Sequence, residues 1–258
     1  MSEARVRLSI QDGVASVVFD RPLARNAMTW AMYEQLGQIC EQLQADAAVR
    51  VVTFRGAGGE AFVAGTDIEQ FKSFRSGEDG VAYEQQIDKC ICRLESLRMP
   101  TVAVIEGWAI GGGLAIATAC DFRIATPASR FGVPIARTLG NCLSVTNLAR
   151  MSAVLGMPRI KRMLMLAETL AADEALDCGF LIQVSEAGEM DAALVQLCER
   201  LGALAPVTQS VTKEGLRRLV GQGLPPDDDL IRRCYGSDDF REGVDAFVGK
   251  RRPVWKGT

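Results

Sequence analysis

The sequence predicts an α/β core followed by a helical C-terminal region. Two observations indicate this class. In the first half, apolar runs such as VRVVTFRG (49–56) and TVAVIEG (101–107) alternate with segments whose apolar residues recur at helical spacing. After residue 141 the pattern is helical to the end of the chain. With 258 residues, 48% hydrophobic and 24% charged, the chain is typical of a globular protein and can bury one large core.

The elements of the first half follow from their patterns in order. RVRLSI and VASVVF, joined by QDG, predict a β-hairpin over 5–19. Helical spacing predicts a helix over 29–45, and a buried strand follows at 49–56. After a glycine-rich loop, we expect a helix over 82–98 that ends at Pro100. A strand at 101–107, three glycines and the helical LAIATACD come next.

The second half contains short strands and then helices. FRIATPASRFGVPI predicts short strands, and GQGLPPDDD (221–229) is the best candidate for a local break. The predicted helices cover about 142–155, 158–166, 171–178, 188–203, 207–220 and 228–248.

Composition excludes several classes of function. The net charge of −3 argues against a broad nucleic-acid or anionic-membrane surface. No apolar run is long enough for a membrane span, and MSEARVRLSI lacks a signal-peptide core. Eight scattered cysteines without a CxxC indicate reduced thiols and a cytoplasmic location. The chain has no histidine, so it has neither Ser-His-Asp nor Cys-His machinery nor a histidine-ligated metal, and we expect no metal site.

Three consecutive glycines, Gly111, Gly112 and Gly113, stand between a predicted strand and a predicted helix. Glycine inside a helix costs roughly 0.5–1 kcal/mol relative to alanine, so the position has a special requirement. The N–H groups at a helix start suit an anion or a developing oxyanion. Tight packing of the helix on a strand is an equally well supported alternative.

A second loop has the same character. FVAGTDIEQF (62–71) also follows a strand and precedes a helical stretch. One backbone N–H from each loop can therefore bind a single carbonyl oxygen. The two loops on successive β–α units are more specific together than either one alone.

These segments together resemble the enoyl-CoA hydratase/isomerase, or crotonase, superfamily over nearly the full chain. RPLARNAMTWAMYEQL is similar to its RPxxxNA segment, FVAGTDIEQF to its AGxD loop, and GWAIGGGLAIATACDFRIAT to its GGG and CD segment. RFGVPIARTLG and EGVDAFVGKRRPVWKG resemble its FGxPExxxG segment and its C-terminal ending. The combination is highly specific for the fold.

The resemblance implies an architecture and a ligand. It implies a ββα spiral core that binds acyl-CoA, which we assign to residues 1–200, and a helical trimerisation region over 201–258. The expected partner is an acyl-CoA thioester, with no cofactor beyond the CoA moiety of the substrate. The expected assembly is a homotrimer or a dimer of trimers, and we expect no nucleic acid or membrane as partner.

The resemblance also assigns site residues. It places the thioester oxygen on the backbone N–H groups of Thr66 and Gly112, which stabilise an enolate, and it makes Asp67 a loop-shaping residue rather than an acid. Arg25 and either Lys250 or Arg251 are candidates for binding the CoA phosphates, although solvated surface cations are an equally supported interpretation. The implied CoA-binding positions are Arg25, Ala64, Gly65, Asp67, Ile68 and Lys250.

Two departures from the family bear on the reaction. Its hydratases use two glutamates to handle water, and here those positions hold Ala115 and Ile135. General acid–base groups contribute typically ~10²–10⁴-fold each, so we expect little hydration by that mechanism. Backbone oxyanion donors remain, at ~10²–10³-fold each. A dry, apolar site favours chemistry without an activated water.

Polar residues of PIARTLGNCLSVTN (134–147) are candidates to replace the glutamates. Arg137 can bind a carboxylate on the acyl group, and Asn141 can hold a water or a carbonyl. Cys142 can act as nucleophile or base if its pKa is lowered. The structural alternatives are that Arg137 pairs with a carboxylate, that Asn141 caps the following helix, and that Cys142 fills the core.

The sequence thus predicts an enzyme that acts through a stabilised thioester enolate, a lyase or isomerase similar to the enoyl-CoA hydratases. Acyl-CoA decarboxylation and double-bond isomerisation both suit a site with few acids. A catalytically silent acyl-CoA-binding subunit is the rival interpretation.

Overall fold

The computed structural model describes residues 4–258. The chain opens with the predicted hairpin, formed by β1 (Arg5–Gln11) and β2 (Val14–Asp20), which pair antiparallel. Asp12 and Gly13 both adopt positive φ, at 50° and 77°, as a two-residue hairpin turn requires. Alternate residues of β2 are buried, so one face of the hairpin packs on the core.

The main sheet has six strands in the order β1-β2-β3-β5-β7-β10. Apart from the β1–β2 hairpin, every neighbouring pair in it is parallel. Its later strands are β3 (Val51–Gly56), β5 (Thr101–Ile105), β7 (Phe122–Ala125) and β10 (Gln183–Val184).

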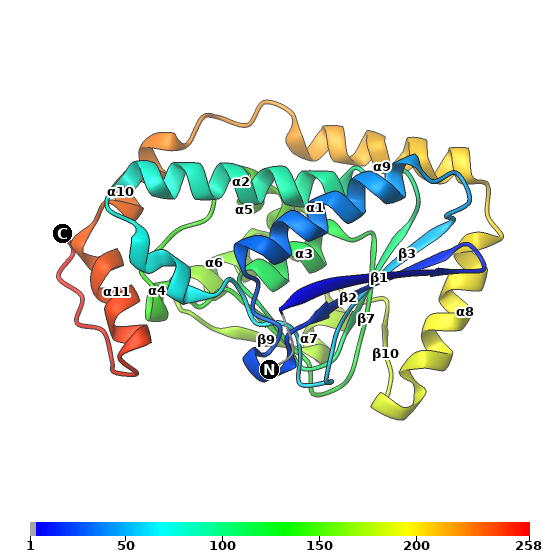
Figure 1. The fold of residues 1–258 in the computed structure, drawn as a ribbon, viewed down its shortest axis with the longest axis horizontal. Helices are drawn as coiled ribbons and strands as arrows, with labels where there is room; N and C mark the ends of the chain where they lie inside the picture. Colours follow the sequence, from blue (N-terminus) through cyan, green and yellow to red (C-terminus); the bar gives the residue numbers. More distant parts are fainter. Residues whose placement is uncertain (1–3) are drawn as a thin grey trace.

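A second sheet of four strands has the order β4-β6-β8-β9. Strands β3, β5 and β7 are each followed by a strand of this second sheet, so every turn of the chain adds one strand to each sheet. Helices close the turns, which confirms the predicted crotonase-type ββα spiral (Figure 1). The strands of the second sheet are β4 (Ala61–Val63), β6 (Trp108–Ile110), β8 (Arg130–Gly132) and β9 (Thr169–Ala171).

Helices cover both faces of the main sheet. The helices α1 (Trp30–Ala45), α2 (Gly77–Glu95) and α3 (Gly112–Ala119) pack with Val52 and Phe54 in the larger core cluster. The opposite face, including Val51 and Val102, packs against α8 (Met190–Gly202) (Figure 1). Because residues of a strand alternate between faces, the continuous apolar strands predicted at 49–56 and 101–107 are buried on both sides.

The C-terminal part consists of three helices, α9 (Pro206–Gly221), α10 (Asp228–Tyr235) and α11 (Asp238–Val248). The predicted break at 221–229 is confirmed. The single helix predicted over 228–248 is wrong, because Ser237 interrupts it and accepts a hydrogen bond from the Phe240 N–H at 3.0 Å. A serine cap starts a new helix within a continuous apolar pattern.

Three other predicted boundaries also need correction. The helix predicted over 82–98 is α2, which spans Gly77–Glu95, because Ser76 and Asp79 form a capping box before it in which the Ser76 N–H donates to the Asp79 carboxylate at 2.8 Å. The helix predicted from 142 begins at Val145, and Ser144 caps it by accepting from the Asn147 N–H at 3.1 Å, so the cap alternative for Asn141 is wrong. The segment predicted as a helix over 171–178 begins with the end of β9, which pairs antiparallel with β8. The remaining helical elements are η1 (Pro22–Ala24), η2 (Ile68–Ser73), α4 (Ile135–Thr138), α5 (Val145–Leu155), α6 (Met157–Met165), α7 (Ala172–Asp177) and η3 (Ala187–Glu189).

The last two helices lie against the core rather than apart from it. α10 packs along α2, and α11 packs against η2, so they cover one end of the molecule (Figure 1). The division at residue 200 and the trimerisation role of the C-terminal region remain predictions. Residues 4–258 include no helix with both the length and the apolar character of a membrane span.

Candidate functional site

The backbone around Thr66 leaves one N–H group directed away from its partner segment. Thr66 forms a parallel bridge with Met28, in which the Met28 N–H donates to Gly65 O and the Asp67 N–H donates to Met28 O, both at 2.8 Å. In a parallel bridge of this kind, the residue between the two bonds directs its own N–H to the other side. The N–H of Thr66 therefore points away from Met28.

The three glycines bring the second loop against the first. Gly111 has φ +55° and is the N-cap of α3, and a Cβ added to it would lie 3.7 Å from the Gly65 Cα. A Cβ on Gly65 would in turn lie 3.5 Å from the Ile110 O. Gly112 is the first residue of α3, so its N–H is one of those without a partner inside the helix. The two loops are thus in contact, and within residues 4–258 neither the Thr66 N–H nor the Gly112 N–H has a backbone hydrogen-bond partner.

Packing also explains why side chains are missing here. A Cβ on Gly113 would lie 2.0 Å from the Val63 O, a contact with rigid backbone. A Cβ on Gly112 would lie 2.4 Å from the Tyr33 Oη. The packing interpretation of the glycines is therefore correct for Gly113, and Gly112 is kept small by the tyrosine hydroxyl.

A chain of three hydroxyl groups lies beside these loops, and sequence reasoning missed two of its members. The Thr66 Oγ1 lies 2.9 Å from the Tyr33 Oη and 2.9 Å from the Tyr83 Oη. Burial raises the pKa of both tyrosines above their ordinary value, so both stay protonated near neutral pH. Tyr33 lies within the helix that helical spacing predicts over 29–45, and a buried phenol fits the apolar pattern of that helix as well as it fits a functional site.

Ala115 and Ile135, which the family resemblance predicts to stand at the glutamate positions of hydratases, both lie in apolar surroundings. Ala115 lies on α3, is 3% exposed and belongs to the main core cluster. Ile135 begins α4 and packs, half-buried, against the same cluster. The local environment of both positions is hydrophobic.

The candidates of the 134–147 segment lie in different surroundings. Arg137 is exposed on α4. Asn141 donates from Nδ2 to the Tyr235 Oη at 3.2 Å. Hydrogen bonding with Cys234 and burial raise the pKa of the Cys142 thiol, which is the opposite of what a nucleophile needs. Cys142 packs against the aromatic cluster that contains Tyr83 and Tyr235, as its core-filling alternative predicts.

Sequence reasoning also missed a buried carboxyl group, Glu84 on α2. It is 2% exposed, and burial raises its pKa to about 8. The Tyr235 Oη donates to its Oε1 at 2.6 Å, and the Ser144 N–H donates to its Oε2 at 3.1 Å. A glutamate in a helix normally faces solvent, so no local signal distinguishes this one. The positions of the tyrosines are the feature that marks this region, because all three tyrosines of the chain lie in it.

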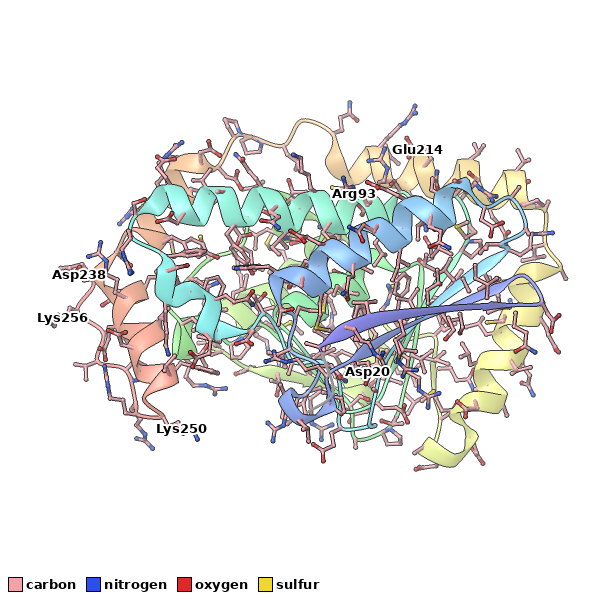
Figure 2. All side chains as sticks on the ribbon, viewed as in Figure 1. Asp20, Arg93, Glu214, Asp238, Lys250 and Lys256 are labelled. Atoms are coloured by element: carbon pink, nitrogen blue, oxygen red, sulfur yellow. The ribbon has the colours of Figure 1, made fainter. Side chains whose placement is uncertain are left out.

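The predicted CoA-binding residues near the first loop lie together. The Ala64 N–H donates to the Arg25 O at 3.1 Å, and Gly65 is held by Met28 as described above. Asp67 caps η2, which starts at Ile68, and pairs with Arg21 at 2.7 Å, a geometry that shapes the loop. Lys250 lies just past the end of α11, the helix that packs against η2 (Figure 2).

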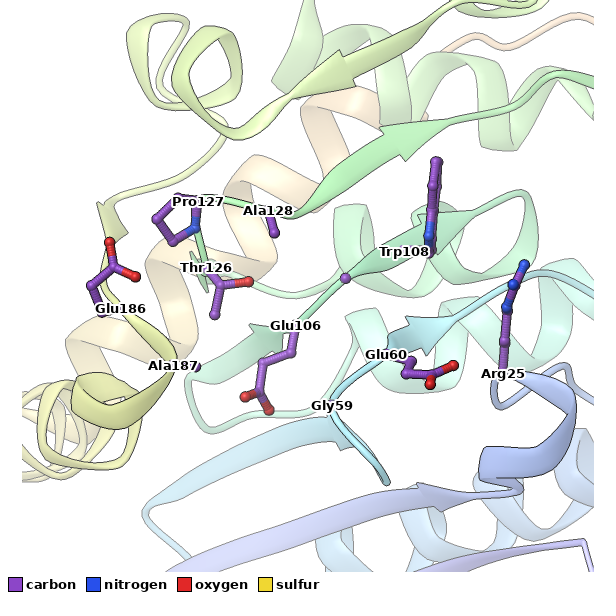
Figure 3. Close-up of a pocket in the computed structure, with 11 residues that line it drawn as sticks. Arg25, Gly59, Glu60, Glu106, Trp108, Thr126, Pro127, Ala128, Glu186 and Ala187 are labelled. Carbon is purple, nitrogen blue, oxygen red and sulfur yellow. The ribbon is translucent and has the colours of Figure 1, made fainter.

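A cavity of about 520 Å³ lies beyond the carboxyl ends of β5, β7 and β10. Its wall includes Arg25 and Trp108 at one end and Glu186 with Pro127 at the other (Figure 3). Glu106, which also lines it, pairs with Arg55 at 2.8 Å. Neither Thr66 nor Gly112 lines this cavity, so it is separate from the two-loop site and shares only the Arg25 neighbourhood with it. Within residues 4–258, no group of three or more acidic or cysteine side chains is arranged to hold a metal ion.

The chain matches known proteins over almost its entire length. The family model described as enoyl-CoA hydratase/isomerase matches residues 9–258. The chain is 31% identical over 251 residues to a short-chain-enoyl-CoA hydratase of Clostridium acetobutylicum, which covers 96% of this chain and 95% of that protein.

Solved structures agree with this match. A crystal structure of an enoyl-CoA hydratase/carnithine racemase from Magnetospirillum magneticum superposes with a TM-score of 0.80 at 31% identity, covering 98% of this chain and 96% of that one. A methylmalonyl CoA decarboxylase complexed with 2S-carboxypropyl CoA superposes with a TM-score of 0.89 at 26% identity, covering both chains fully (100%). The spiral fold, the paired loops and these matches agree, and the chain belongs to the enoyl-CoA hydratase/isomerase family.

Proposed function

We propose that this chain is an acyl-CoA enzyme that stabilises a thioester enolate between the backbone N–H groups of Thr66 and Gly112. Support comes from the contact between the two loops that carry these groups and from the outward direction of the Thr66 N–H. Two such donors aimed at one oxygen stabilise the charge that develops there, at about 10²–10³-fold per donor. Relatives named as acting on CoA thioesters support the substrate class.

The reaction that this site supports best is decarboxylation of a 2-carboxyacyl-CoA. The observation that supports this choice is the apolar surroundings of Ala115 and Ile135, the two positions that the family resemblance aligns with the water-activating glutamates of hydratases. Loss of CO₂ needs an enolate site but no activated water. The similarity to a methylmalonyl-CoA decarboxylase supports the same choice.

The proposed decarboxylation breaks one carbon–carbon bond and then protonates the α-carbon. The bond between the α-carbon and the carboxylate breaks, CO₂ leaves, and the electron pair forms the enolate whose oxygen binds the two N–H groups. The α-carbon then takes a proton that originates from water. The hydroxyls of Tyr33, Thr66 and Tyr83 form a continuous chain beside the loops and can relay that proton. Their raised pKa values keep the phenols as proton donors rather than anions.

Two further parts of the proposal concern assembly and location. We propose a homotrimer or dimer of trimers, supported by α9, a 16-residue helix without a buried residue that exposes Val207, Val211, Leu216 and Leu219. Association would remove this apolar surface from water. A cytoplasmic location is supported by the eight cysteines, all of which are free thiols in the structure.

The deciding experiment gives the purified protein methylmalonyl-CoA and crotonyl-CoA in parallel. We expect CO₂ release and propionyl-CoA from the first at an ordinary enzyme rate, kcat in the ~1–10³ s⁻¹ range, and little loss of the enoyl absorbance with the second. Hydration of crotonyl-CoA at such a rate would refute the argument from Ala115 and Ile135. Binding of both esters without turnover would instead identify a silent acyl-CoA-binding subunit.

A second pair of assays separates the remaining alternatives. A 3-enoyl-CoA tests double-bond isomerisation, which would show as a rise in the conjugated enoyl absorbance. The variant Arg137→Ala tests the predicted contact with the substrate carboxylate. We expect a higher KM for methylmalonyl-CoA and an unchanged affinity for propionyl-CoA, which lacks that carboxylate.

A further inference from the structure

The buried carboxyl of Glu84 is not used in the mechanism above. It lies next to Tyr83 on α2 and is 2% exposed. Its two oxygens accept hydrogen bonds from different elements, Oε1 from the Tyr235 Oη of α10 at 2.6 Å and Oε2 from the Ser144 N–H at 3.1 Å. The carboxyl thus joins α2, α10 and the loop that contains Asn141.

Asn141 completes a chain of three side chains. Its Nδ2 donates to the Tyr235 Oη at 3.2 Å, while its Oδ1 is buried and has no hydrogen-bond partner within residues 4–258. A buried acceptor without a partner is unfavourable, so something must fix the amide in this orientation. The hydrogen bond between Tyr235 and Glu84 fixes this orientation of the Asn141 amide. The single proton of the Tyr235 hydroxyl is donated to Glu84, so Tyr235 can only accept from Asn141.

We propose that Glu84 is a positioning residue that determines, through Tyr235, which end of the Asn141 amide is directed away from Tyr235. With Glu84 as a carboxylate, the amide offers its carbonyl oxygen on that side. When Glu84 takes up a proton, it donates to the Tyr235 Oη, and the phenol proton becomes available. The Asn141 amide then rotates by half a turn, its Oδ1 accepts the phenol proton, and its NH₂ group takes the other side.

This switch lies next to the two-loop site. Cys142, the neighbour of Asn141, packs in one aromatic cluster with Tyr83 and Tyr235, and the Tyr83 Oη contacts the Thr66 Oγ1. Its effect on a substrate rests on the proposed function. An NH₂ group binds a carboxylate or a carbonyl, whereas an amide oxygen repels both. Proton uptake by Glu84 therefore favours a substrate that carries a carboxylate.

The surroundings of the carboxyl place its titration near neutral pH. Burial raises the pKa of Glu84 to about 8, and its bonds from Tyr235 and Ser144 oppose this shift. Nearby carboxylates add to the rise in pKa because like charges disfavour ionisation. The titratable and charged groups that face it are Tyr33 on α1, Tyr83 and Asp88 on α2, Asp227 before α10, Cys234 and Tyr235 on α10, Cys142 on the loop, and Arg150 of α5, which faces Asp88.

The test follows the side-chain amide of Asn141 directly, by NMR of the full-length protein between pH 6 and 10. Its signal is assigned by its loss in Asn141→Ser. We expect the signal to shift with a midpoint near pH 8 in the wild type and to be independent of pH in Glu84→Gln. Tyr235→Phe must also abolish the shift, because it breaks the chain without changing the carboxyl. Glu95→Gln on the same helix, which removes the partner of Arg150, is the matched control and must retain it.

The opposite results overturn the proposal. A wild-type Asn141 signal without a pH dependence rules out the switch, and so does a midpoint near 8 that persists in Tyr235→Phe. If Glu84→Gln does not fold, the Tyr235→Phe comparison still decides the matter.

A binding measurement then connects the switch to the site. We expect the Kd of methylmalonyl-CoA to rise about tenfold from pH 7 to pH 9, and the Kd of propionyl-CoA to change less. The difference must disappear in Tyr235→Phe. A switching Asn141 signal with a Kd independent of pH would overturn the link to the substrate. If neither ester binds, the proposed function fails, while the NMR result still decides the switch.

Discussion

The contact between Gly112 and Tyr33 gives the sharpest test of the site geometry. A Cβ added to Gly112 would lie 2.4 Å from the Tyr33 Oη, but its next neighbours, the Thr66 Oγ1 and the Tyr33 Cζ, would be at ordinary distances of 3.5 and 3.7 Å. The Tyr33 hydroxyl oxygen is therefore the only one of these atoms that a Cβ at position 112 would clash with. Because Tyr33 is only 2% exposed, it cannot move aside cheaply. We expect Gly112→Ala alone to lower the free energy of unfolding by about 1–3 kcal/mol.

Removal of the hydroxyl should relieve this strain. Tyr33→Phe alone loses one hydrogen bond, worth about 0.5–1.5 kcal/mol, while the Thr66 hydroxyl keeps its bond with Tyr83. In the Tyr33→Phe background, Gly112→Ala should cost little. The coupling between the two sites should therefore be about 1–3 kcal/mol, well above the few tenths expected of independent sites.

Urea unfolding of the four proteins in this cycle measures the coupling through the midpoint and slope of each transition. Gly113→Ala is the matched control. Its Cβ would meet the backbone Val63 O at 2.0 Å, so Tyr33→Phe cannot rescue it. Additive effects of Gly112→Ala and Tyr33→Phe would refute the assignment of Tyr33 as the group that keeps Gly112 small.

Three more outcomes follow from the structure. The pKa of Glu84 is about 8 in the folded protein, above its ordinary value of 4.5. The contribution of this group to the free energy of unfolding is therefore fully present below pH 4.5 and falls as the pH rises towards 8, by up to about 1.4 kcal/mol per pH unit. Glu84→Gln should remove this slope from the free energy of urea unfolding measured between pH 5 and 8. The double variant Ala115→Glu with Ile135→Glu should raise the rate of crotonyl-CoA hydration above its low wild-type level, by ~10²–10⁴-fold for each glutamate. A folded double variant without this activity would count against the loop geometry. Val211→Glu on α9 should convert the assembly to monomers, as measured by light scattering. Leu23→Glu, at a leucine on η1 that is 89% exposed, is the control and should leave the assembly intact. Equal masses for the two variants would exclude α9 as the interface.

Much of the fold could be predicted from local signals. The QDG turn, the apolar runs of β3 and β5, and the glycines before α3 each carry their own chemical reason in a few residues. Two strands that were not predicted depend on distant partners. β9 and β10 are only three and two residues long, and they exist because β8 and β7 lie beside them. The break between α10 and α11 has a local cause, the Ser237 cap, but helical periodicity continues across it and hides that signal.

Part of the candidate site could be predicted. The pairing of two loops follows from the strand, glycine and helix pattern, which acts locally, whereas the choice of the Thr66 and Gly112 N–H groups rests on the family resemblance and stays a prediction. Tyr33, Tyr83 and Glu84 could not be recognised, because their roles arise from contacts with residues far along the chain. Tyr33 meets Thr66 across 33 positions, and Glu84 meets Tyr235 across 151. The sequence around a polar residue in a helix does not indicate which distant residue it will contact.

The convergence of all three tyrosines on one region has an optical consequence. Each is hydrogen-bonded and buried or half-buried there, and burial raises the pKa of each phenol above its ordinary value. Alkali should therefore leave the phenols uncharged until this region opens. The rise of the ultraviolet band of tyrosinate with pH would then report the loosening of this one part of the molecule without an added label, because the tryptophans and phenylalanines of the chain do not titrate.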